Sequence, residues 1–204
     1  MPFFKTIAPL DRGVDQISDD LIIAENAWTK LEQFRIKRKT VRSFPGYKSI
    51  LAAGSSIGAF GTLLEEFTLF DGTSFFLIGD STTIYRYNPN TKTLTSLGTT
   101  FTPTRDEPWM SFFYADDIYV TNKNDGLYTW DGAAAAFTAV GGSPPKARSG
   151  EILNDHVILL NTSTDPQLLP WSAEGAVTSW TATALNDAGS MSLKDTPDVG
   201  VALY

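Results

Sequence analysis

The 204-residue sequence contains no cysteine and only one histidine, His156. The absence of cysteine excludes disulfides and thiolate metal sites. With a single histidine, a transition-metal site would have to be built mostly from carboxylates. We therefore expect no metal site, and we interpret His156 as a structural residue where a turn meets a strand.

Long apolar runs and a leader-like N-terminus are also missing. No run of about 18 apolar residues occurs, so we expect no membrane anchor. The opening residues lack a basic flank followed by a long apolar segment, which predicts a chain made in the cytoplasm without a secretory signal. At 42% hydrophobic and 12% aromatic residues, the composition is that of a folded chain rather than a disordered one.

The motifs of common enzyme classes are absent as well. The sequence contains no phosphate-binding glycine motif and no G-x-S-x-G serine. Its adjacent carboxylates would point to opposite faces of a strand and would not meet; they are Asp19-Asp20, Glu65-Glu66 and Asp116-Asp117. A calcium loop at 122–126 is disfavoured because Lys123 occupies a ligand position. We predict a protein that is not an enzyme, with no catalytic residue and no cofactor.

Charge is distributed unevenly along the chain. Residues 1–50 hold nine Lys and Arg against six Asp and Glu, whereas residues 51–204 hold seven against seventeen. The acidic remainder disfavours tight nucleic-acid binding, which depends mainly on Lys and Arg. A basic cluster near the N-terminus suits an acidic partner or a subunit contact. Its members are Arg35, Lys37, Arg38, Lys39 and Arg42.

Strand and turn signals dominate from about Phe67 onward. Short runs of aromatic and β-branched residues alternate with turn dipeptides, namely Asp71-Gly72, Asn88-Pro89, Asp125-Gly126, Asp131-Gly132 and Gly141-Gly142. Three segments repeat one plan of strand, turn, strand, turn and strand: 69–98, 112–141 and 151–183. A repeat of about 40 residues with several short strands is typical of β-propeller blades.

Aromatic residues recur at matching places in these repeats. Tyr85, Tyr128 and Leu169 form one matching set, and Tyr87, Trp130 and Trp171 form another. We expect the aromatic members, together with Trp180, to pack between blades. Tryptophans such as Trp109 could instead stack against sugars, which would suit a binding module.

The predicted fold class is all-β, built from antiparallel propeller-like blades, with a β-sandwich as the alternative. Known propellers have at least about four blades, so three repeats alone give an incomplete propeller. We predict an N-terminal arm at 1–66 that carries the basic strand, and blades at 67–204. Open sheet edges invite pairing, so we expect assembly with other subunits.

Two stretches carry a family resemblance. The first, at 13–50, matches through Gly13, Val14, Asp15, Ala24, Glu25, Asn26, Arg42, Pro45, Gly46 and Tyr47. The second, at 169–193, matches through Trp171, Ser172, Gly175, Trp180, Asn186, Ala188, Gly189 and Ser190. Both resemble motifs of bacteriophage tail proteins that contain propeller domains, of the hub, nozzle or tail-tubular kind. In those proteins, the second motif leads into a further blade.

The resemblance implies a structural protein of the virion tail. It implies a homo-oligomeric ring around the DNA channel, with adaptor, nozzle or fibre subunits as partners. DNA would pass without sequence-specific binding, and Tyr47 would join the basic residues as a subunit-interface candidate. A propeller module that recognises glycan or protein on the host surface remains the alternative, followed by a glycan-cleaving enzyme with paired acids in a cleft.

Overall fold

The computed structural model describes residues 34–37, 40–43, 51–53, 55–98 and 100–193. The chain divides into two compact units, Met1–Ser49 and Ile50–Tyr204. In the first unit, β1 (Phe34–Lys37) and β2 (Thr40–Ser43) form an antiparallel pair. The boundary expected between residues 66 and 67 falls inside a strand of the second unit, so the blade region begins earlier than the sequence indicates.

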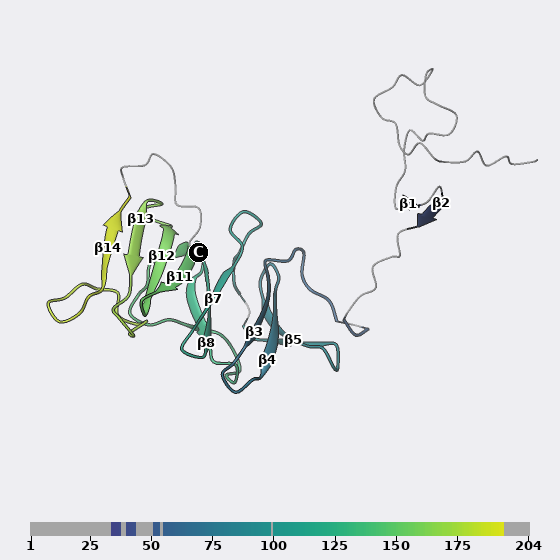
Figure 1. Cartoon of the computed structure of the whole chain (residues 1–204), viewed down its shortest axis with the longest axis horizontal. Helices are drawn as coiled ribbons and strands as arrows, with labels where there is room; N and C mark the ends of the chain where they lie inside the picture. The colour runs from purple at the N-terminus through teal and green to yellow at the C-terminus, as the bar shows by residue number, and fades with distance from the viewer. Residues whose placement is uncertain (1–33, 38–39, 44–50, 54, 99, 194–204) are drawn as a thin grey trace, which may run out of the picture. The chain divides into compact units, whose positions relative to one another are not determined.

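The second unit consists of three four-stranded antiparallel sheets, and no helix occurs among the described residues. Figure 1 shows the sheets following one another in chain order. This confirms the all-β class and is consistent with propeller-like blades. The described residues do not close into a ring, and stacked sheets of this kind are also consistent with a sandwich.

Sheet 1 is a meander of four consecutive strands, β3 (Leu63–Thr68), β4 (Ser74–Gly79), β5 (Ile84–Asn88) and β6 (Thr93–Ser96). Asp71-Gly72 lies in the turn between β3 and β4, as the sequence predicts, and Asn88-Pro89 lies where β5 ends and the turn to β6 begins. Gly72 adopts φ +87°, a left-handed conformation that glycine adopts without steric cost.

Sheet 2 repeats the meander with β7 (Met110–Tyr114), β8 (Asp117–Asn122), β9 (Gly126–Trp130) and the short β10 (Thr138–Ala139). The β7–β8 turn is Ala115-Asp116, both with positive φ. That pattern matches the tight two-residue hairpin turns that suit strand twist. Asp116 therefore lies in the turn, whereas Asp117 already belongs to β8 and pairs with Tyr114.

Sheet 3 contains β11 (Ala147–Leu153), β12 (His156–Thr162), β13 (Leu168–Trp171) and β14 (Gly189–Ser192). Its edge strand β14 lies beyond the predicted end of the third repeat at residue 183. The Ala-Gly-Ser stretch at 188–190, read as leading into a further blade, instead runs into β14, where Gly189 pairs with Trp171.

The register of the strands tests the repeat. Tyr85 is paired with Ile78 and Tyr128 with Val120, so the first matching set holds between sheets 1 and 2. Tyr87 and Trp130 likewise occupy equivalent positions. In sheet 3 the match is shifted by one residue.

The shift is measured from the first hairpin of sheets 2 and 3, each of which has a two-residue turn. Counting from the turn, Ile158 corresponds to Tyr119, and Trp171 is paired with Ile158. Trp171 is therefore the equivalent of Thr129, which is paired with Tyr119. Because side chains alternate along a strand, one residue of shift moves Trp171 to the opposite face from Trp130.

A helix long and apolar enough to cross a membrane does not occur in the described part of the chain.

Candidate assembly surfaces

The three sheets of the second unit stack with one polarity. We call the face of a sheet that looks toward the next sheet in chain order its front face, and the opposite face its back face. The front face of sheet 1 packs on the back face of sheet 2, and the front face of sheet 2 packs on the back face of sheet 3. Each internal interface is therefore of the same front-to-back kind.

The first interface, between sheets 1 and 2, is aromatic on both sides. Trp130 is 1% exposed, and its ring lies 5.9 Å from Phe67 and 5.1 Å from Phe75 in edge-on geometry. Such arrangements are favoured by the ring quadrupoles. Tyr128 lies beside this core, 5.2 Å from Phe101. Tyr128 and Trp130 thus pack between sheets.

The second interface, between sheets 2 and 3, is aromatic on one side only. Phe112 and Tyr119 of sheet 2 stack with ring centroids 5.3 Å apart. Sheet 3 presents small and aliphatic residues to them, and a Cβ added at Gly150 would lie 2.7 Å from the Phe112 ring. Glycine is therefore required there by close approach. Trp180 packs against this core from the loop after β13.

Three of the expected packing residues lie on outer faces. Tyr85 and Tyr87 share the back face of sheet 1, because they are paired with Ile78 and Phe76. Trp171 lies on the front face of sheet 3 with Ile158. None of these three belongs to either inter-sheet core. Among the described residues, no further sheet covers these two faces.

The strands that carry the outer faces contain uninterrupted apolar runs. Strand β4 contains the run Phe75–Ile78 and strand β12 the run Val157–Leu160, each apolar without interruption. Uninterrupted apolar runs are typical of strands covered on both faces. The predictions from the sequence did not use this signal.

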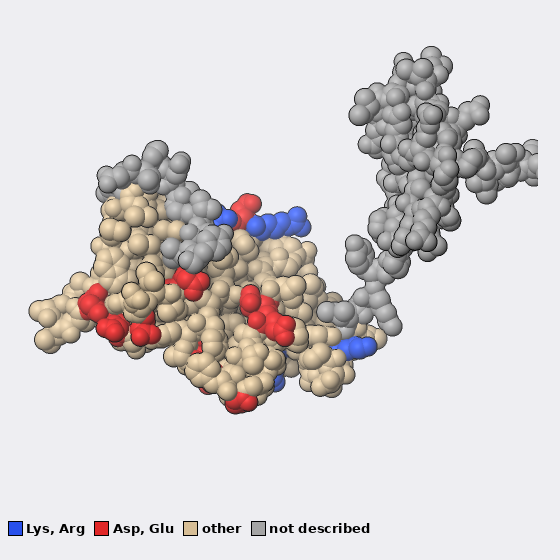
Figure 2. Space-filling view, viewed as in Figure 1, with Lys and Arg blue, Asp and Glu red and all other residues tan. Residues whose placement is uncertain are grey.

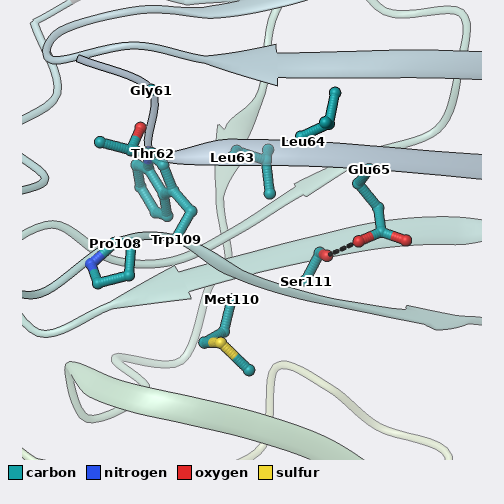
Figure 3. A pocket seen from close by; sticks show the side chains of 9 residues that line it. All are labelled: Gly61, Thr62, Leu63, Leu64, Glu65, Pro108, Trp109, Met110 and Ser111. Carbon is teal, nitrogen blue, oxygen red and sulfur yellow. Dashed lines mark hydrogen bonds between the residues drawn. The ribbon is translucent and has the colours of Figure 1, made fainter. Parts of the chain in front are cut away.

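The first strands of sheets 1 and 2, β3 and β7, line a groove (Figure 3). It is lined by 61–65 at the start of β3 and by 108–111 at the start of β7. Ser111 Oγ donates to Glu65 Oε2 at 3.0 Å, and the backbone N–H of Trp109 donates to the Thr62 carbonyl at 3.2 Å. Glu65 is the one carboxylate among these lining residues, so this groove does not supply the facing pair of acids that glycoside hydrolysis uses.

The predicted interface residues fall in the first unit. Arg35 and Lys37 lie on β1 and Arg42 on β2, where Arg35 is paired with Arg42. The structure therefore brings three members of the basic cluster onto one hairpin. Arg38, Lys39 and Tyr47 lie outside the described residues.

The polar residues that resembled a calcium loop form a turn. Asn122 Oδ1 accepts from the N–H groups of Asn124 and Asp125, at 2.8 and 2.7 Å. The N–H groups of Thr82 and Thr83 donate to Asp80 Oδ1 in the same way. These are side-chain turns of the kind that Asn and Asp favour. In the described part of the chain, no three acidic or histidine side chains gather as a metal site.

His156 has structural contacts at the start of β12. Its Nδ1 lies 2.7 Å from the Ser172 carbonyl oxygen, and its Nε2 lies 3.8 Å from Asp187 Oδ2. The N–H of Glu174 donates to Asp187 at 2.9 Å and is the main cause of that carboxyl's lowered pKa. The histidine thereby ties β12 to the loop that leads to β14.

Acidic side chains of the second unit are spread over its surface. Figure 2 shows them in several separate groups on the visible face, with few Lys and Arg among them. Dispersed negative charge repels a polyanion without forming a defined binding site. No protein-family model, curated protein or solved structure matches the chain.

Proposed function

We propose that the protein is a non-enzymatic structural component of a bacteriophage tail, a hub or nozzle subunit of a ring around the DNA channel. The observation that carries the proposal is the pair of apolar outer sheet faces on the second unit. A subunit built this way is completed by neighbours, because large exposed apolar surface is costly in water. The two sequence stretches that resemble tail proteins supply the identity of the assembly.

Charge supports the same role. An acidic second unit repels DNA and allows it to slide, whereas a basic first unit can hold an acidic neighbour. The basic hairpin β1–β2 is the place for that contact, with adaptor, nozzle or fibre subunits as its partners. Changing Lys37, Arg38 and Lys39 to glutamate should abolish tail assembly while the second unit stays folded. Normal particles with that triple variant would contradict the assignment.

The tryptophans bear on the alternative role in host-surface recognition. A sugar stacks on an exposed aromatic face, but Trp109 and Trp130 are only 4% and 1% exposed. Trp171 and Trp180 are partly buried, and each indole N–H donates to a backbone carbonyl. These contacts favour a packing role for the tryptophans in the described region over a glycan platform.

Quantitative mass spectrometry of purified particles tests the tail role. Particles of the phage that encodes this chain should contain it in a fixed copy number, about six or twelve for a symmetric ring. The matched control is the same measurement on particles whose tails have been removed, which should lose the chain. Absence of the chain from intact particles would overturn the proposal. Binding of the purified chain to host cells would then favour the recognition module.

A further inference from the structure

The two outer faces hold the same register positions as the faces that are packed inside the second unit. On the back face of sheet 1, the residues equivalent to Ile118, Val120, Tyr128 and Trp130 of sheet 2 are Phe76, Ile78, Tyr85 and Tyr87. On the front face of sheet 3, Ile158 and Leu160 are equivalent to Tyr119 and Thr121 of sheet 2. Each outer face therefore repeats one half of an interface that the chain already forms internally.

At both internal interfaces, the first strand of one sheet contacts the first strand of the next sheet. Glu65 of β3 meets Ser111 of β7 through a 3.0 Å hydrogen bond. One sheet further, Phe112 of β7 meets Gly150 of β11. The register makes Glu65, Phe112 and Glu151 equivalent on front faces, and it makes Leu64, Ser111 and Gly150 equivalent on back faces. The next contact in this series would join Glu151 to a Leu64, and both of these residues are on outer faces.

Exposure is uneven over the positions that such a contact would cover, because Leu160 on the front face of sheet 3 is only 4% exposed. Leu64 is 78% exposed on the back face of sheet 1, and Met191 is 51% exposed on the front face of sheet 3. Phe76 and Tyr87 pack edge-on beside Leu64's strand, with ring centroids 6.4 Å apart. The apolar side chains on the back face of sheet 1 could therefore pack against the aliphatic side chains on the front face of sheet 3, as apolar faces do at the internal interfaces.

We propose that the front face of sheet 3 packs on the back face of sheet 1 of a second copy of this chain, and that two copies close a ring. Three blades from each copy give six, within the range of about four to eight found in propellers. Each copy would then make two identical head-to-tail contacts with the other, one through sheet 1 and one through sheet 3. The resulting dimer leaves neither outer face uncovered. This proposal deepens the assembly role proposed above and rests on it, because the six or twelve copies expected in a tail would then be three or six such dimers. It concerns the purified chain, so its test requires no virion.

Thiol cross-linking tests the predicted contact, because the natural chain has no cysteine. Leu64→Cys and Glu151→Cys would be made in separate chains that carry tags of different size, mixed, and treated with a short bis-maleimide. We expect a cross-linked product that contains both tags. Leu185→Cys is the matched control, since Leu185 is 98% exposed in the loop before β14 and on neither face. It should cross-link to neither partner above background.

Sedimentation equilibrium of the unmodified chain provides the second measurement. The expected mass is twice the 22.3 kDa of one chain. Leu64→Glu should weaken self-association by about tenfold or more, because it removes an apolar contact and buries a charge. Leu185→Glu should leave the association unchanged, and circular dichroism would verify that both variants are folded.

Three results would overturn the proposal. A monomeric unmodified chain would show that the outer faces do not bind a second copy. Cross-linking of Leu64→Cys only to itself would indicate back-to-back pairing instead. Species larger than a dimer would show that the contact does not close. None of these results decides the tail role, because other tail subunits could cover the same faces and the tail role is judged from the content of virions.

Discussion

The two interfaces between sheets share one geometry but differ in what fills them. Between sheets 1 and 2, rings from both sides interlock around Trp130. Between sheets 2 and 3, Phe112 and Tyr119 lie against glycine, alanine and aliphatic side chains. The first interface depends on aromatic volume, whereas the second depends on close approach of one sheet to another. The repeat thus preserves hairpins and register while the side chains between sheets vary.

The largest expected effect comes from removing the aromatic centre of the first interface. Trp130→Ala should lower the free energy of unfolding by about 3–5 kcal/mol, because it leaves a cavity among Phe67, Phe75 and Phe137. Guanidinium unfolding at low protein concentration would measure it. Trp171→Ala is the control, since Trp171 lies on an outer face, and it should cost clearly less. Equal losses would remove the distinction between packed and outer aromatics.

The difference between Trp130 and Trp171 also marks how far the sequence could predict the fold. The hairpin turns and aromatic spacing correctly matched Tyr85 with Tyr128 and Tyr87 with Trp130. The predicted match of Trp171 with Trp130 was wrong for two reasons. Asn161 has φ +60°, and the connection from β12 to β13 is longer than the one from β8 to β9. A single left-handed residue near a strand end changes the count without leaving a clear composition signal.

Two strands were missed for related reasons. Strand β3 reads Leu-Leu-Glu-Glu-Phe-Thr, in which apolar and acidic residues come in pairs and hide the alternation expected of a strand. Strand β14 follows a long loop after β13, so its pairing depends on contacts distant in sequence. The contact of Glu65 with Ser111, which sets the candidate assembly geometry, could not be derived from local pattern because it joins two different sheets.

The next effect tests close approach at the second interface. Gly150→Ala should destabilise the chain by about 1–3 kcal/mol, because the new methyl group would lie 2.7 Å from Phe112 and 3.0 Å from Leu159. Gly61→Ala is the matched control, with its nearest neighbour at an ordinary 4.0 Å. Phe112→Leu added to Gly150→Ala should recover part of the loss in a double-mutant cycle. No coupling between the two positions would contradict this account of the interface.

A smaller effect distinguishes the turns of sheets 1 and 2. Burial acts to raise the pKa of Asp80, but N–H donors from Thr82, Gly58 and Thr83 outweigh it, so the pKa lies below its usual value. A lowered folded-state pKa gives stability that is present above the unfolded value, about 3.9, and is lost as pH falls through the folded one.

Asp80→Asn should therefore cost about 1 kcal/mol at pH 7, and the difference from the natural chain should shrink as the solution is acidified. Urea unfolding across a pH series would measure it. At the equivalent turn of sheet 2, Asn122→Asp should instead destabilise the chain at pH 7, because Asn122 Nδ2 donates to Asp125 Oδ2 at 2.9 Å and the variant would bring two carboxylates together. A loss at Asp80 that does not change with pH would show that shape, and not charge, holds the turn.

The smallest effect has the opposite sign and lies in sheet 2. Burial, with the nearby carboxylates of Asp131 and Asp116, raises the pKa of Asp117. A raised folded-state pKa gives stability that is present below the unfolded value and is lost as pH rises through the folded one. Asp117→Asn should thus stabilise the chain at pH 7 by about a few tenths of a kcal/mol, with the gain disappearing in acid. If the variant were less stable at pH 7, the charge of Asp117 would be favourable, and sheets 1 and 2 would not differ in this respect.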